Sequence, residues 1–269
     1  MHVHFLDPYQ ERPSLLHRLD ARVKLLAALA FILTTSLTPP GTWAVYLLLL
    51  AGVVAAELLS DIPLGYYQKR ALLALPFVLA ALPLPFTVSG TPLWTLSLGA
   101  WSLTASQEGV VRLLSIAFKS WISLQAAVVL VSTTAFPDLL MALRALRLPR
   151  LLVAIIGLMW RYLFVMVDEA LRLMRARTAR SGESAQAGLR PGGSVLWRAR
   201  VAGGMAGSLF LRSIERSDRI YMAMLARGYD GEVRSSATPR VPGREWLILT
   251  VFFLLLVALL GLSFLLRAP

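Results

Sequence analysis

The chain has 269 residues, a mean hydropathy of +0.66 and a hydrophobic share of 57%, whereas soluble domains hold about 45–50% apolar residues. This composition excludes a soluble globular domain and predicts an integral membrane protein, and the lack of cysteine excludes disulfides and thiolate metal sites. The formal net charge is +12, and every basic residue except Lys24, Lys69 and Lys119 is an arginine, whose planar side chain suits carboxylate and phosphate recognition.

Residues 1–22 contain two prolines, several charges and no apolar run, so we expect no cleavable signal peptide. Six apolar segments then follow, each close to the roughly 17–25 residues that a helix needs to cross the hydrocarbon. These candidate spans are 23–37, 43–59, 71–88, 110–131, 151–167 and 246–266. Three prolines within 71–88 predict a kinked third helix.

The distribution of basic residues favours five spans rather than six. If all six crossed, the arginine-rich segment 168–244 would lie opposite the basic N-terminal tail, against the positive-inside bias. Removing 151–167, which carries Arg161 in its middle, resolves this conflict, because 18 of the 27 basic residues then lie in one cytoplasmic region between 137 and 244. The alternative is a tilted sixth span over 151–167.

The predicted fold is therefore an all-α integral membrane protein with a large cytoplasmic insertion before the last span. We expect a membrane domain over 1–134, a cytoplasmic helical domain over 135–245 and the last transmembrane helix over 246–269. The N-terminus is expected in the cytoplasm. The uncharged loops 38–42 and 89–107 are expected outside, the second as a hairpin-like cap.

Two basic residues lie within the fourth predicted span. Arg112 follows Glu108 by one helical turn, and we expect these two side chains to pair near the outer surface. Lys119 lies deeper, where an intramembrane charge marks a functional candidate, but a structural ion pair with Glu57 is the interpretation we favour.

The insertion is divided by clear helix signals. A short helix opens at Phe136-Pro137-Asp138, a long one follows over about 151–179, and a breaker segment covers 182–193. Ser194 is the expected N-cap of a last helix that continues to Arg227.

The last of these helices has features of close helix contact. Gly203 and Gly207 stand one turn apart and predict a small-residue face at which two helices cross. The remaining pattern predicts an apolar stripe and a solvated charged face on the other side. The stripe consists of Leu211, Ile214, Tyr221, Met222 and Leu225, and the charged face of Arg212, Glu215, Arg216, Asp218 and Arg219.

Two short motifs, Ala179-Arg180-Ser181 and Ala226-Arg227-Gly228, end the two long helices. Small neighbours leave the arginine unobstructed, and a glycine that ends the helix places it at the tip, where a partner's pocket could receive it. We therefore predict two docking arginines, with an ordinary solvated charged face as the alternative.

Several kinds of chemistry have no sequence support. No lysine follows a glycine, so there is no P-loop for nucleotide hydrolysis. The three histidines, His2, His4 and His17, lie before the first span and cannot complete a Ser/His/Asp set. We predict no catalytic residues, no metal site and no cofactor.

Three stretches resemble the transmembrane T components of energy-coupling factor transporters, especially the cobalt group, CbiQ. They are Leu16-His17-Arg18-Leu19-Asp20-Ala21-Arg22-Val23-Lys24, Arg161-Tyr162-Leu163-Phe164 with Asp168-Glu169-Ala170, and Glu215-Arg216-Ser217 leading to Ala223-Met224-Leu225-Ala226-Arg227-Gly228-Tyr229. The resemblance covers nearly the whole chain. It departs from the usual pattern at Ser181, where the family has glycine in the first motif.

The resemblance implies a non-enzymatic subunit of a prokaryotic cytoplasmic membrane importer, most simply for cobalt. In that family the T component joins a small substrate-binding S component to two ABC-type ATPase subunits, and the two arginine motifs dock on the ATPases. No nucleic acid partner is implied. A T component for nickel, biotin or other vitamins is an alternative. Another alternative, from a different class of protein, is a membrane enzyme or channel with an anion-binding or lipid-binding arginine surface.

Overall fold

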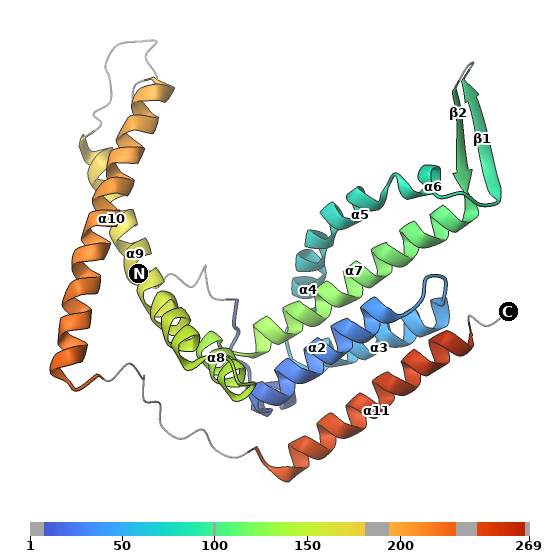
Figure 1. The fold of residues 1–269 in the computed structure, drawn as a ribbon, viewed down its shortest axis with the longest axis horizontal. Coiled ribbons are helices and arrows are strands. Elements are labelled where there is room, and N and C mark those ends of the chain that lie inside the picture. The colour runs from blue at the N-terminus through green and yellow to red at the C-terminus, as the bar shows by residue number, and fades with distance from the viewer. Residues whose placement is uncertain (1–7, 99–100, 181–193, 230–240, 267–269) are drawn as a thin grey trace. The chain divides into compact units, whose positions relative to one another are not determined.

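The computed structural model describes residues 8–98, 101–180, 194–229 and 241–266 (Figure 1). The described chain is built of helices and one two-stranded hairpin. It divides into two compact units, one formed by residues up to Ala145 together with those from Thr238 onward, and the other by Leu146–Ala237. The first is called the membrane unit below and the second the long-helix unit.

Four long helices lie against one another in the membrane unit (Figure 1). They are α2 (Ala21–Leu37), α3 (Trp43–Leu59), α7 (Gln107–Thr133) and α11 (Gly243–Leu265), with the short helices α1 (Leu15–Arg18) and α8 (Phe136–Ala145) beside them. Helix α2 begins where the Asp20 side chain accepts a hydrogen bond from the Arg22 backbone N–H at 2.8 Å. The apolar segments predicted at 23–37, 43–59, 110–131 and 246–266 thus form helices.

The third predicted span forms as a broken helix. It begins earlier than expected and consists of α4 (Leu64–Ala71), a 3₁₀ turn (Leu72–Ala74), α5 (Leu75–Ala81) and α6 (Leu84–Thr87). Pro76 and Pro85 lie in the first turns of α5 and α6, where a residue without an N–H is tolerated. The predicted kink is therefore confirmed.

The predicted hairpin is also confirmed. Strands β1 (Pro92–Leu98) and β2 (Trp101–Ser106) pair antiparallel, with Leu96 opposite Leu103. Ser106 then caps α7, since its hydroxyl accepts from the Gly109 N–H at 3.1 Å. A side chain at Gly109 would meet the Leu84 carbonyl oxygen at 2.6 Å, so glycine is required for this contact between α6 and α7.

The membrane unit has an apolar interior and an apolar exterior. One buried cluster joins α2, α3, α7 and α11 through Phe31, Val45, Tyr46, Leu49, Val53, Ile122, Ala126 and Leu256. Leucines at the other faces of these helices are exposed, among them Leu47 at 60% and Leu254 at 62%. Large exposed apolar surfaces of this kind suit contact with lipid.

Four described helical segments are long and apolar enough to cross a membrane, and Trp43–Leu59 is a shorter apolar helix. The four are Leu64–Thr87, Gln107–Thr133, Arg150–Arg180 and Gly243–Leu265. Because Arg150–Arg180 is among them, length and composition do not choose between five and six spans. The fold is an all-α membrane protein, and the side on which each loop lies stays a prediction.

The long-helix unit contains α9 (Arg150–Arg180) and α10 (Val195–Ala226). The predicted cap is confirmed, because the Ser194 hydroxyl accepts from the Trp197 N–H at 3.2 Å. Figure 1 shows the two helices running in opposite directions, so that α9 ends toward the start of α10. Neither helix has a buried residue, so most of their surface is open to a partner or to the surroundings.

Candidate functional site

The first arginine motif lies at the C-terminal end of α9. The helix ends at Arg180, and Arg177 and Arg180 both lie in its last turn, where positive charge is favourable for the helix dipole. Ala179 and Arg180 are exposed. Ser181, which completes the predicted motif, and the following Gly182 lie outside the described residues.

The second motif ends α10 in a well-defined hydrogen-bonded turn. The Gly228 N–H donates to the Leu225 carbonyl at 2.9 Å, and the Tyr229 N–H donates to the Met224 carbonyl at 3.0 Å. These two bonds are the pattern of a Schellman motif with Gly228 at the left-handed position, and its φ is +79°. The expectation that glycine ends this helix is confirmed.

Arg227 is held at the tip by this turn. It is the C-cap residue of α10, and its N–H bonds to the Met224 carbonyl at 3.1 Å. Ala226, Arg227 and Gly228 are all exposed. The motif therefore presents a guanidinium flanked by small residues on a helix end whose backbone is fixed.

The two motifs lie at different ends of the helix pair. Helix α10 has 32 residues and so is about 48 Å long, and α9 runs the opposite way (Figure 1). Arg180 at the end of α9 and Arg227 at the end of α10 are thus separated along much of that length. Such a pair could contact two separate pockets rather than one.

Arg212 of the predicted charged face of α10 is exposed and also contacts α9. We expected Arg212 in the solvated face, but its guanidinium bonds to the Glu169 carboxylate on α9. Glu169 also lies 3.6 Å from Arg172, and its side chain is only 16% exposed. Arg212 thus lies on the exposed face as predicted, with its side chain 55% exposed, and its ion pair with Glu169 of the neighbouring helix was not predicted from the sequence. The Asp168-Glu169 pair just before Arg172 was the available signal.

The predicted apolar stripe of α10 is exposed in this unit. Leu211, Tyr221 and Met222 are 63%, 54% and 66% exposed. The half-buried positions lie on another face, and they include Val201, Met205, Leu209, Arg216 and Ile220. The stripe therefore does not pack against α9, and Arg216 is less solvated than expected.

Gly203 and Gly207 face open space in the described part of the chain. A Cβ added at either residue would meet nothing within 4 Å. The close contact of α9 with α10 is made elsewhere, through Glu169 and Arg212. The surface at these glycines is not covered by α9, and a helix crossing there stays a prediction.

Two predicted ion pairs in the membrane unit are wrong. Lys119 donates to the Ser36 backbone carbonyl at 2.9 Å, not to Glu57. Glu57 is fully buried, and neither of its carboxylate oxygens has a hydrogen-bond partner among the described residues. The Glu108 carboxylate accepts from the Thr91 N–H at 2.9 Å rather than binding Arg112.

No group of three or more His, Cys, Asp and Glu side chains that could hold a metal ion occurs in the described part of the chain.

Comparisons with known proteins find relatives among transport proteins. The cobalt transport protein CbiQ of Salmonella typhimurium is 29% identical over 78% of this chain and 90% of its own length. The energy-coupling factor transporter transmembrane protein EcfT of Lacticaseibacillus paracasei is 27% identical over 94% of this chain and 98% of its own. CbiQ of Rhodobacter capsulatus is 26% identical over 90% of this chain and 91% of its own length.

The model of the cobalt transport protein family CbiQ matches residues 12–239 of this chain, a range that contains α2, both long helices and both arginine motifs. The chain therefore belongs to the CbiQ cobalt transport protein family.

Proposed function

We propose that this chain is the energy-coupling membrane subunit of an energy-coupling factor importer. In this proposal it transmits the conformational change of two ABC-type ATPase subunits to a small membrane partner that binds the transported substrate. The membrane is the prokaryotic cytoplasmic membrane, and the long-helix unit lies on its cytoplasmic side. The transported substrate is the cobalt ion, which the partner binds.

One observation carries this proposal: two exposed arginines end two long antiparallel helices. A helix pair of this length reaches two docking pockets at once, so movement of one ATPase subunit relative to the other would change the position of the helices. Each helix is held along its length by backbone hydrogen bonds, so a displacement at its docked end would move the rest of the helix. The Glu169–Arg212 pair holds the two helices together between the motifs.

The family and the names of the relatives support the same role. The family is one of transport proteins, and the L. paracasei relative is named as the transmembrane protein of an energy-coupling factor transporter. We therefore assign ATP hydrolysis to the partners and no enzymatic activity to this chain.

The test is to replace each arginine and measure ATPase co-purification and cobalt uptake in membranes. Arg180→Ala or Arg227→Ala removes a charge-assisted contact and leaves a buried acidic partner unpaired, a loss of about 2–5 kcal/mol. We expect either change to weaken retention of the ATPase subunits and the double change to abolish uptake. Lysine in place of either arginine should restore little ATPase retention, since lysine keeps the charge but not the planar fork of the guanidinium.

Matched controls come from the same two helices. Arg175 on α9 and Arg219 on α10 are exposed and lie away from the helix ends. Alanine at either should cost little, as expected for a charge on a solvated surface. If all four single variants lost the ATPases equally, the arginines would act as a diffuse basic surface and the docking role would be wrong.

A further inference from the structure

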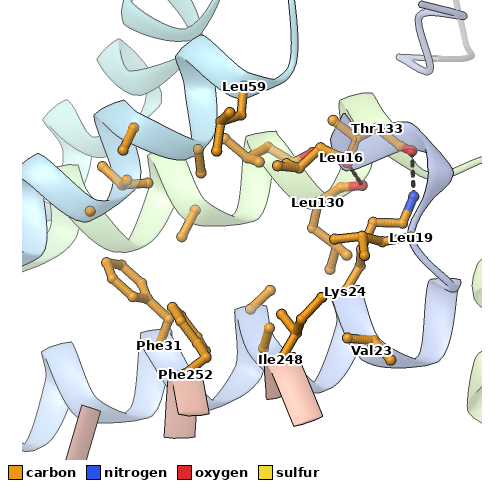
Figure 2. Close-up of a pocket in the computed structure, with 18 of the residues that line it drawn as sticks. Leu16, Leu19, Val23, Lys24, Phe31, Leu59, Leu130, Thr133, Ile248 and Phe252 are labelled. Carbon is orange, nitrogen blue, oxygen red and sulfur yellow. Dashed lines mark hydrogen bonds between the residues drawn. The ribbon is translucent and has the colours of Figure 1, made fainter. Parts of the chain in front are cut away.

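The membrane unit contains a cavity that the proposed function does not use. It has a volume of about 370 Å³ and lies between α2, α3, α7 and α11, as Figure 2 shows. Its walls are almost entirely apolar, with Phe31 and Phe252 at one end and Leu16 and Leu19 toward the other. The volume falls within the roughly 300–1,000 Å³ of small-molecule sites.

The cavity exists because small residues line the facing helices. Ala27 and Ala28 on α2 and Gly52, Ala55 and Ala56 on α3 leave space that larger side chains would fill. An empty apolar space of this size is unfavourable, because the atoms that line it lose their contacts. In a membrane protein the hydrocarbon chain of a lipid is the abundant molecule of matching polarity.

One end of the cavity is polar. Lys24 and Thr133 lie on its wall, and the Lys24 ammonium donates to the Thr133 carbonyl at 2.7 Å (Figure 2). Both residues, together with Leu19, also line a second hollow of about 260 Å³. The apolar cavity and the polar hollow are therefore neighbours that share a wall of Leu19, Lys24 and Thr133, and their order matches the polarity of a lipid tail followed by its headgroup.

The polar hollow carries charges of both signs. Its basic side chains are Arg22, Lys24 and the imidazole of His17, and its acidic side chains are Asp20 and Asp138. The Asp20 carboxylate is engaged by the Arg22 backbone at 2.8 Å and lies 3.8 Å from its guanidinium. The structure records no hydrogen bond to the Asp138 carboxylate within the described ranges, and Asp138 is exposed at the start of α8.

We propose that this double cavity binds one phospholipid with an ethanolamine headgroup. The acyl chain occupies the apolar cavity, the phosphate lies beside Lys24 and Arg22, and the ammonium donates to Asp138. A purely anionic headgroup would leave Asp138 facing a negative charge. A choline headgroup carries no N–H and cannot donate to it. The bound lipid would contact α2, α3, α7, α8 and α11 and so link these five helices.

The first test uses the unsubstituted full chain. The protein is delipidated in detergent, incubated with equal amounts of dioleoyl phosphatidylethanolamine, phosphatidylcholine and phosphatidylglycerol, and analysed by native mass spectrometry. We expect one retained phosphatidylethanolamine per chain, preferred about tenfold, the ratio that a free-energy difference of one charge-assisted contact gives. Failure to retain a lipid, or equal retention of all three, would overturn the proposal.

The second test locates the lipid with matched variants on α3. Ala56→Phe fills the cavity and should abolish retention, whereas Ala51→Phe, on an exposed face that does not line it, should leave retention unchanged. Thermal unfolding of both variants shows whether each is folded. Equal retention by the two would place the lipid elsewhere and overturn the proposal.

A headgroup variant completes the assignment. Asp138→Asn should remove the preference for phosphatidylethanolamine while phospholipid still binds, because the cavity for the acyl chain is intact. An unchanged preference in this variant would refute the role of Asp138 and, with it, the ethanolamine assignment. ATPase co-purification is measured in parallel and is not expected to change, so this outcome is distinct from failure of the docking arginines.

Discussion

Replacing Gly228 tests whether the end of α10 must be held in one conformation to present Arg227. Gly228 has a φ of +79°, and a Cβ added there would meet nothing within 4 Å. The effect of an alanine at this position should therefore come from the backbone conformation and not from a contact of its Cβ. Substitutions can be chosen that differ only in how well they tolerate the left-handed region.

The expected cost follows from that conformation. A non-glycine L-residue in the left-handed region costs about 1–2 kcal/mol, and asparagine tolerates it better than alanine or a β-branched residue. We therefore expect the last turn of α10 to weaken in the order Gly228→Asn, Gly228→Ala, Gly228→Val. A cost of 1–2 kcal/mol is a factor of about 5–30 in the population of the frayed end.

The assay is amide hydrogen exchange, with ATPase co-purification as the functional measurement. The informative amides are those of Gly228 and Tyr229, which donate to the Leu225 and Met224 carbonyls. Their exchange should rise about 5–30-fold in the alanine variant, and retention of the ATPase subunits should fall in parallel.

The control is Gly204→Ala, since Gly204 is also open but lies within the helix. Alanine there should strengthen α10 by about 1 kcal/mol, because alanine has the higher helix propensity. Equal exchange in the asparagine and valine variants, or fraying in the alanine variant with no loss of ATPase binding, would contradict a docking role for a fixed helix end.

Three further predictions concern topology and packing. Cysteine at Ser89 should react with an impermeant thiol reagent from outside and cysteine at Ala199 only after lysis; external labelling at Ala199 would restore the sixth span. Gly207→Leu should weaken assembly of the transporter while membrane insertion is kept, and undiminished ATPase retention would show that no helix packs there. Gly109→Ala should lower the free energy of unfolding by about 1–3 kcal/mol, because its Cβ would lie 2.6 Å from a backbone oxygen. Gly65→Ala should not lower the free energy of unfolding, because a Cβ there would meet nothing within 4 Å. Equal shifts of the melting temperature in the two variants would argue against the close contact at Gly109.

The sequence alone determined the features that depend on neighbouring residues. Ser194 begins α10 and Gly228 ends it because capping hydrogen bonds join residues within a few positions of one another. The broken third helix follows from prolines that lack an N–H, and the apolar segments follow from the length of chain that hydrocarbon requires. The arginine motifs could be found for the same reason, since helix end, small neighbours and charge are all local.

Which side chains meet across helices depends on how the helices pack together. Arg212 pairs with Glu169, 43 positions away, and Lys119 bonds to the Ser36 carbonyl instead of Glu57. A difference of one position in helix alignment rotates a side chain by about 100°, so composition and spacing do not fix such partners. The cavity beside Lys24 likewise depends on how four helices separated in sequence lie together, because its walls come from small residues that look unremarkable on any one of them.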